Sequence, residues 1–126
     1  MKKFGLILLG LCFSAVAMAQ PAIEFKQTYH DFGRIYEQDG NVTHEFTFKN
    51  TGTTPLLITN VHSGCGCAGA VWTRTPIAPG ESGVISATYN PRGRPGAFNR
   101  AFRITSNIED TVVRIFVRGE VIRRAE

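Results

Sequence analysis

Methionine and cysteine are scarce in this sequence, and their positions limit the chemistry that the chain supports. Both methionines lie within residues 1–19, and so does Cys12, one of the three cysteines. Beyond that segment the chain has no methionine, which argues against a copper carrier that holds its metal through methionine sulfur. Only Cys65 and Cys67 remain there, so a structural zinc site built from two cysteine pairs is excluded.

Long apolar runs are also missing, except at the N-terminus. Residues 1–19 combine the basic start MKK with the apolar run FGLILLGLCFSAVA, which is shorter than a membrane-spanning helix. Ala17-Met18-Ala19 follows, with small residues where signal peptidase requires them. We expect a signal peptide over residues 1–19, cleavage after Ala19, and a periplasmic or secreted protein with no transmembrane segment in its mature part. The alternative, an N-terminal membrane anchor, is disfavoured by the short run.

Charge is distributed unevenly along the expected mature chain. Residues 20–91 contain four Lys and Arg against six Asp and Glu, whereas residues 92–126 contain eight arginines against four acidic residues. The net charge of residues 20–126 is +2, from twelve basic and ten acidic residues. This modest charge and the expected compartment argue against nucleic acid as a partner. The arginine-rich part indicates a surface for an acidic protein or an anionic glycan of the cell envelope.

No segment shows the periodicity of an amphipathic helix. Apolar and polar residues instead alternate in VTHEFTFKN (42–50), GVISATYN (83–90), FNRAFRIT (98–105) and TVVRIFVRGEV (111–121). Turn sequences rich in glycine, proline and asparagine separate these runs. About seven strands in a single domain, residues 20–126, predict an all-β immunoglobulin-like β-sandwich.

Two polar residues fall on the face of a predicted strand that should point inward. His44 alternates with Val42, Phe46 and Phe48, and we expect it to be a core or rim histidine rather than a ligand. Arg100 shares its face with Phe98 and Phe102 and interrupts an otherwise apolar alternation. The sequence gives no reason for an arginine at that position.

Several short motifs occur in a fixed order along the chain: DFG (31–33), FKNTG (48–52), CGC (65–67), IAPG (77–80), YNPRGRPG (89–96) and SN (106–107). In this order and spacing they resemble the DUF1573 family, short secreted domains common in Bacteroidetes. The likeness runs from about Phe25 to Val121, and the family is similar to PapD-like and ASPM-SPD-2-hydin-like sandwich domains. The resemblance implies a sandwich fold and a secreted compartment, but no reaction.

The cysteine turn departs from the pattern of that family in one respect. The family's turn usually reads S-C-G-C-T, whereas this chain has Gly64 and Ala68 at the flanking positions. Two hydroxyl groups that could bond nearby backbone are therefore missing from the turn.

The Cys65 and Cys67 pair has three possible uses. An oxidising compartment favours a disulfide, and Gly66 permits the bend that such a short loop needs. With His62 the two sulfurs provide three ligands for Cu(I) or Zn²⁺. A thiol-redox role is the third use, although thiol oxidoreductases usually carry C-x-x-C in a βαβ setting. A soft-metal or thiol-redox protein using His62, Cys65 and Cys67 is thus the alternative function, and the main interpretation requires no cofactor.

The arginines of the last strands form the candidate interface. Arg114, Phe116 and Arg118 project from the same face of one predicted strand, and Arg100 and Arg103 come from the preceding one. Arginine and aromatic side chains are enriched at protein interfaces. The alternative is a solvated sheet face with cross-strand ion pairs to the nearby acidic residues Glu109, Asp110 and Glu120.

Sequence motifs of catalysis are missing. No G-x-S-x-G nucleophile elbow is present, and neither a phosphate-binding glycine loop nor a pair of catalytic carboxylates is apparent. The sequence therefore predicts a secreted or periplasmic module of the cell envelope that is not an enzyme and serves in protein binding or structure.

Overall fold

The computed structural model of the protein describes residues 19–123, so the expected signal peptide lies outside the described residues. The described part has no helix that is long and apolar enough to cross a bilayer. It consists of strands and one short 3-10 helix, η1. The elements are β1 (Ile23–Phe25), β2 (Tyr29–Tyr36), η1 (Glu37–Asp39), β3 (Val42–Asn50), β4 (Ile58–His62), β5 (Ala68–Trp72), β6 (Ser82–Tyr89), β7 (Gly96–Ser106) and β8 (Val112–Ile122).

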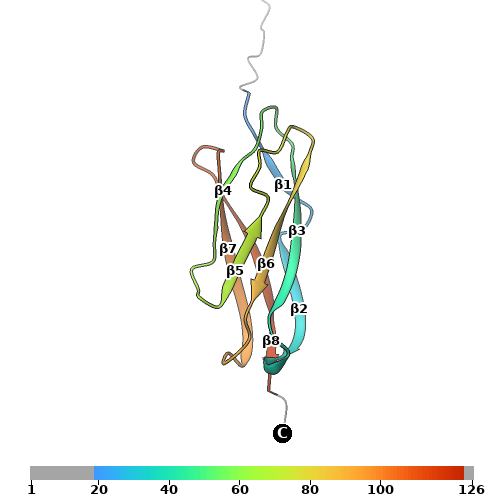
Figure 1. Ribbon diagram of the computed structural model, residues 1–126, viewed down its shortest axis with the longest axis vertical. Coiled ribbons are helices and arrows are strands. Elements are labelled where there is room, and N and C mark those ends of the chain that lie inside the picture. Colours follow the sequence, from blue (N-terminus) through green and yellow to red (C-terminus); the bar gives the residue numbers. More distant parts are fainter. Residues whose placement is uncertain (1–18, 124–126) are drawn as a thin grey trace, which may run out of the picture.

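The strands form two four-stranded sheets, in the orders β1-β3-β6-β5 and β2-β8-β7-β4. Figure 1 shows the sheets as two layers, one behind the other, along the long axis of the molecule. Each strand pair is antiparallel except β2–β8, which is parallel. The predicted immunoglobulin-like sandwich is confirmed, with eight strands in place of about seven. The number rises because the N-terminal segment crosses between the layers: β1 pairs with β3, and β2 pairs with β8.

The core lies between the two layers, where alternate residues of each long strand meet. In β3, Phe46 and Phe48 are each 1% exposed while the residues between them face solvent, as the alternation predicts. The buried hydrophobic residues are Phe46, Phe48, Leu56, Ile58, Val61, Cys67, Ile77, Ile85, Ala87, Tyr89, Phe98, Phe102, Ile104, Ile115, Val117 and Val121.

Asn50 is the buried polar residue that organises the loops at one end of the sandwich. Its side chain is fully buried, and its Nδ2 donates hydrogen bonds to the carbonyl oxygens of Thr54 (2.8 Å) and Ile77 (2.9 Å). Its Oδ1 accepts from the backbone N–H of Gly52 (2.9 Å) and of Ala22 (3.3 Å). One amide thus satisfies four backbone groups from three segments of the chain, which offsets the cost of burying it.

Phe98 supports the sheet β2-β8-β7-β4 from inside, at a point where β8 lacks a side chain. It lies directly opposite Gly119 in the β7–β8 ladder, and its ring stacks on Tyr89 of the other sheet at 3.9 Å between centroids. A Cβ atom at Gly119 would lie 2.9 Å from this ring and 2.8 Å from the carbonyl oxygen of Gly33. Glycine is therefore required at position 119, because any side chain would displace the ring or β2.

Candidate interaction surface

The outer face of the sheet β2-β8-β7-β4, here called the arginine face, carries a row of basic side chains. The register places Arg103 of β7 directly opposite Arg114 of β8, and His62 of β4 directly opposite Arg103. All three residues are exposed. We call His62, Arg103 and Arg114 the arginine row. Neither arginine forms an ion pair with any residue between 19 and 123.

Aromatic residues lie beside the arginine row on the same face. Tyr29 of β2 pairs in register with Phe116 of β8, which is opposite Ala101 of β7. Tyr29 is 54% exposed, and the guanidinium of Arg118 lies 4.6 Å from the centre of its ring. Phe116 is half-buried between its neighbours. Aromatic surface thus adjoins the arginines, and aromatic residues are enriched at protein interfaces.

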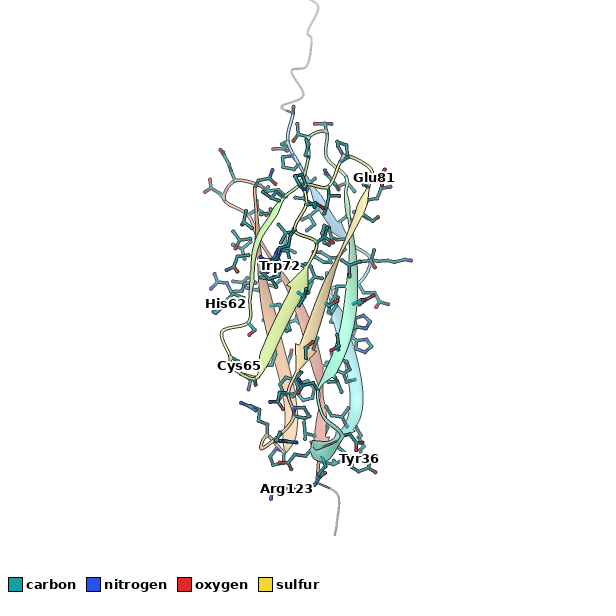
Figure 2. The ribbon with its side chains drawn as sticks, viewed as in Figure 1. Tyr36, His62, Cys65, Trp72, Glu81 and Arg123 are labelled. Carbon is teal, nitrogen blue, oxygen red and sulfur yellow. A yellow bond between two sulfur atoms is a disulfide. The ribbon has the colours of Figure 1, made fainter. Side chains whose placement is uncertain are left out.

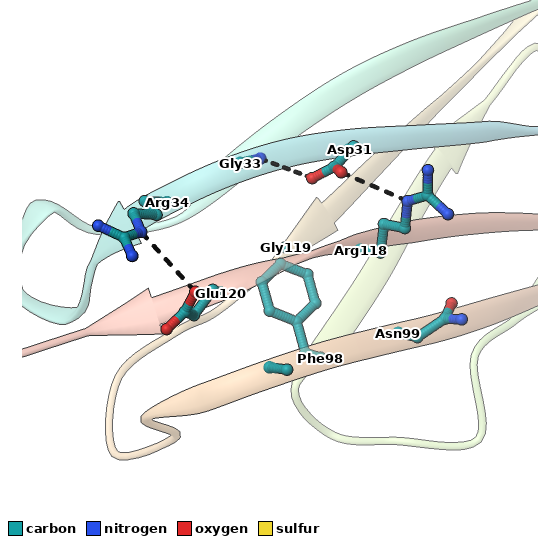
Figure 3. Close-up of a pocket in the computed structure, with 9 residues that line it drawn as sticks. Asp31, Gly33, Arg34, Phe98, Asn99, Arg118, Gly119 and Glu120 are labelled. Atoms are coloured by element: carbon teal, nitrogen blue, oxygen red, sulfur yellow. Dashed lines mark hydrogen bonds and ion pairs between the residues drawn. The ribbon is translucent and has the colours of Figure 1, made fainter.

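The far end of the arginine face differs, because its charges are paired. Asp31 contacts Arg118 at 3.4 Å, and Arg34 contacts Glu120 at 3.8 Å. These residues surround a shallow depression of about 360 Å³ above Gly119. Figure 3 shows the two ion pairs on either side of Gly119, with the Phe98 ring beside it. Exposed pairs of this kind contribute little to stability, about 0–1 kcal/mol each.

The predicted interface residues are only partly brought together. Arg103, Arg114, Phe116 and Arg118 share the arginine face, because each points outward from β7 or β8. Arg100 is exposed but belongs to the inward side of β7, with the buried Phe98 and Phe102. It is therefore not part of the arginine face.

The ion pairs expected for a solvated face are formed only in part, since Glu120 takes an arginine partner, Arg34 of β2, across the strands. In the described residues the acidic partners of the arginines are Asp31, Glu37 and Glu120, and neither Glu109 nor Asp110 pairs with an arginine. Glu109 and Asp110 lie in the turn between β7 and β8, beyond the ends of both strands. The sequence also did not identify Tyr29 or His62 as members of this face, since β2 and β4 reach it through pairings between distant segments.

The cysteine turn connects β4 to β5 and crosses from one layer to the other. Cys65 and Cys67 form a disulfide, with 5.2 Å between their Cα atoms, and Cys67 is 1% exposed. Gly66 lies in the turn as expected, where the N–H of Ala68 donates to the carbonyl oxygen of Cys65 (3.3 Å), and Gly64 before it has a positive φ of 71°. The hydroxyl of Ser63 lies 3.0 Å from the carbonyl oxygens of Cys65 and Ala68. Ser63 thus takes the backbone-bonding role of the hydroxyls missing at positions 64 and 68.

The metal set considered from the sequence is not assembled in this turn. Both sulfurs belong to the disulfide, and His62 points outward in the arginine row. Between residues 19 and 123 no group of three His, Cys, Asp or Glu side chains is placed to hold a metal ion. Figure 2 shows His62 and Cys65 on the same side of the sandwich, separated along its long axis. No observation in the described residues supports metal binding at this position.

A stacked histidine pair joins the two layers on the opposite side of the molecule. His30 of β2 and His44 of β3 lie parallel at 3.7 Å between ring centres, with Phe32 and Phe46 edge-on to them. Burial lowers the pKa of His44, the nearby His30 lowers it further, and Glu45 opposes the shift. As expected from the sequence, His44 packs at the rim of the core and faces inward.

The outer face of the sheet β1-β3-β6-β5, here called the threonine face, has a different composition. The hydroxyls of Thr43 and Thr88 are 2.8 Å apart across β3 and β6. Its charged residues alternate with neutral ones, and Glu24 of β1 lies opposite Lys49 of β3. This face therefore pairs unlike charges, whereas the arginine row pairs like charges.

Residues 23–121 match the family model described as protein of unknown function, DUF1573. The chain belongs to the DUF1573 family. This match covers all eight strands except the last residue of β8, so the family resemblance inferred from the motifs is confirmed. No curated protein matches the DUF1573 chain significantly.

Solved structures similar to this DUF1573 chain share its fold. A protein of unknown function from Porphyromonas gingivalis W83 has a TM-score of 0.69 and 24% identity, over 86% of this chain. The Vibrio cholerae VesB protease (TM-score 0.58, 16% identity) matches over 81% of this chain and 31% of its own length. The YadV chaperone (TM-score 0.51, 14% identity) matches over 82% and 52%. The chain spans about half of the P. gingivalis structure, 51%.

Proposed function

We propose that this protein is a non-catalytic module of the bacterial cell envelope, secreted or periplasmic, that binds an acidic partner protein through its arginine face. The compartment follows from the signal peptide expected over residues 1–19. The DUF1573 family carries no assigned function, so the proposal rests on the surface itself.

The observation that carries the proposal is the unpaired arginine row. Arg103 and Arg114 lie directly opposite each other with no acidic side chain between them, in the part of the chain that the structure describes. Like charges in this position destabilise a sheet by about 0.2–1 kcal/mol. A threonine or glutamate at either site would remove this cost, so the fold does not require the pair. An acidic ligand would convert it from a repulsive pair into a binding site.

The aromatic neighbours strengthen the interpretation as a protein interface. Tyr29 and Phe116 offer apolar contact area next to the arginines, and tyrosine and arginine are among the residue types enriched at energetically important interface positions. The surface around these aromatic residues is polar at one end of the face, where Asp31, Arg34 and Glu120 lie. An apolar centre with a charged surround is the common anatomy of protein interfaces.

Site-specific photo-crosslinking in the native envelope tests the proposal. Val112 lies on the arginine face at 44% exposure, and Val71 on the threonine face at 71% exposure, so the two form a matched pair of positions. A photoreactive benzoylphenylalanine would replace each in turn. We expect a discrete protein adduct from position 112 and none from position 71.

The specificity of that adduct is checked by charge reversal. The combined substitution Arg103→Glu and Arg114→Glu should abolish the adduct from position 112, because an acidic partner would meet two acidic side chains. Equal adducts from both positions, or an adduct indifferent to the reversal, would count against the proposal. An adduct that resists protease and contains carbohydrate would identify an anionic glycan as the ligand instead.

A further inference from the structure

Strand β7 is longer than the neighbour that should cover it. Its partner β8 pairs with residues from Gly96 to Thr105, whereas β4 pairs only with residues from Arg103 to Ser106. The chain leaves β4 after His62, turns at the disulfide and enters the other layer as β5. Figure 1 shows β7 continuing below this turn, and no described strand of its own sheet lies on that side.

The direction of the backbone groups along the uncovered part follows from the hydrogen bonds on either side. The N–H of Phe116 donates to Thr28 (2.8 Å), so Phe116 points toward β2 and its neighbours in β8 point toward β7. The N–H of Asn107 donates to Leu57 (3.0 Å) on the β4 side. Since backbone groups alternate along a strand, the odd-numbered residues of β7 face the β4 side.

Three residues of β7 therefore direct both backbone groups at an empty position in the sheet: Ala97, Asn99 and Ala101. No hydrogen bond outside the strand ladders involves them among residues 19–123. We call them the free edge. Ala97 and Asn99 are exposed and Ala101 is half-buried. Their side chains are small, so they leave room for another backbone alongside.

We propose that the free edge receives an extended, acidic segment of the partner protein as an added strand, in line with β4. This inference rests on the proposed function and specifies how the partner is held. An added strand would satisfy the backbone groups of the free edge by hydrogen bonding, as in other cases of strand addition. It would also place the partner beside the arginine row, since Arg103 is the next residue of β7 that faces β4.

The charges on both sides of the free edge select an acidic strand. Arg100 projects from the inner side of β7 but is exposed, and its side chain makes no ion pair or hydrogen bond with any residue from 19 to 123. Arg103 flanks the edge on the outer side. Acidic residues on either face of an incoming strand would thus meet an arginine. This accounts for Arg100 at an otherwise apolar inward position.

The same charges oppose pairing between two copies of this chain. Two free edges brought together would place Arg100 and Arg103 of one copy near those of the other. An inward-pointing charge on an edge strand is a recognised means of preventing such association. Charge repulsion therefore disfavours pairing of the free edge with a second copy of this chain and favours pairing with an acidic strand.

Amide NMR of the folded protein tests the proposal, with a synthetic peptide alternating threonine and glutamate as the probe. In the free protein, the amide protons of Ala97, Asn99 and Ala101 should exchange rapidly, and those of Phe98, Arg100 and Phe102 slowly. Saturating peptide should slow exchange at the first three by at least about tenfold, because each gains a hydrogen-bonded partner. The same peptide with lysine in place of glutamate should leave exchange unchanged.

Two variants separate backbone pairing from charge. Asn99→Pro removes an N–H that faces the free edge and not the β8 ladder, so the sheet should persist while peptide affinity falls at least about tenfold. Arg100→Glu leaves the backbone intact and should weaken the acidic peptide by a similar factor while admitting the lysine peptide. If Asn99→Pro unfolds the protein, the Arg100→Glu result and the exchange data still decide the question.

Three outcomes would overturn the proposal. One is slow exchange at Ala97, Asn99 and Ala101 without peptide, which shows that the edge is already covered. Another is protection there that grows with protein concentration alone, which shows self-association. A third is peptide binding that shifts only residues of the arginine face, such as Arg103, Arg114 and Phe116. That result would rule out the added strand but would still agree with binding through the arginine face.

Discussion

The two outer faces of the sandwich both cover a four-stranded sheet, but they do so with different side chains. On the threonine face, hydroxyls pair across strands and Glu24 lies opposite Lys49. On the arginine face, Arg103 lies opposite Arg114, and the ion pairs are confined to the other end of the sheet. Both faces belong to strands in which inward and outward residues alternate, although the β2–β8 and β4–β7 pairings of the arginine-face sheet contain register shifts. The threonine face shows that paired polar side chains are sufficient for the outer surface of this fold. The unpaired arginines of the arginine face are therefore not required for folding.

Both sheets contribute buried aromatic rings to the core, and removing one of these rings should give the largest loss of stability. Phe48 belongs to the threonine-face sheet and Phe98 to the arginine-face sheet, at 1% and 7% exposure. Each substitution to alanine should lower the free energy of unfolding by about 3–5 kcal/mol, because both remove a packed aromatic ring. Urea denaturation measures this. If only one of the two substitutions lowered the free energy of unfolding, the two sheets would differ in their core packing as well as in their outer side chains.

The loops at one end depend on β3 of the threonine-face sheet. Asn50→Ala should lower the free energy of unfolding by about 1–3 kcal/mol, because four backbone groups lose their partner in a buried site. The exposed neighbour Lys49→Ala is the matched control and should change it by less than about 0.5 kcal/mol. Thermal or urea unfolding of both variants provides the comparison. Equal effects would contradict the role assigned to Asn50.

The disulfide is expected to serve the scaffold and not the arginine face. Replacing Cys65 and Cys67 by serine should cost about 1.5 kcal/mol of unfolding free energy, the chain-entropy value for so short a loop. The crosslinking yield from position 112 should be unchanged. A loss of that adduct in a folded double variant would support the alternative thiol function.

The histidine stack joins the two layers and gives a smaller, pH-dependent effect. Burial and then His30 lower the pKa of His44 below its ordinary value of 6.5, so the unfolded chain binds a proton more readily than the folded one. Stability should therefore fall as pH drops below about 6.5 and level off below the folded-state pKa. Urea midpoints across this range measure the slope. His44→Phe keeps an aromatic ring at this position but removes the titrating group, so it should reduce the dependence of stability on pH. An unchanged dependence would assign the effect to other groups.

Alternation allowed much of the fold to be predicted, because it depends on neighbours in sequence. His44, Phe46 and Phe48 took their inward positions in β3 as expected. The position of Arg100 on the inner side was also visible, but its reason was not. In the structure β4 ends opposite Arg103, which places Arg100 beside the free edge.

The arginine row could not be predicted, because it depends on register between strands. Arg103 and Arg114 face each other only through the β7–β8 pairing, and His62 joins them after an irregularity between Ile58 and Asn60 in the β4–β7 pairing. A shift of one residue would turn the side chains of a strand to the other face. The parallel pairing that brings Tyr29 beside Phe116 has no local signal in the sequence.

One measurement tests the central claim most directly: the crosslinking yield from position 112 in the single variant Arg103→Glu. This variant replaces a like-charge pair by an opposite-charge pair with Arg114, so its free energy of unfolding should rise by about 0.2–1 kcal/mol. If the row exists for binding, the more stable protein should capture its partner at least about tenfold less efficiently. Full capture by the stabilised variant would contradict the claim that the arginine row is the binding surface.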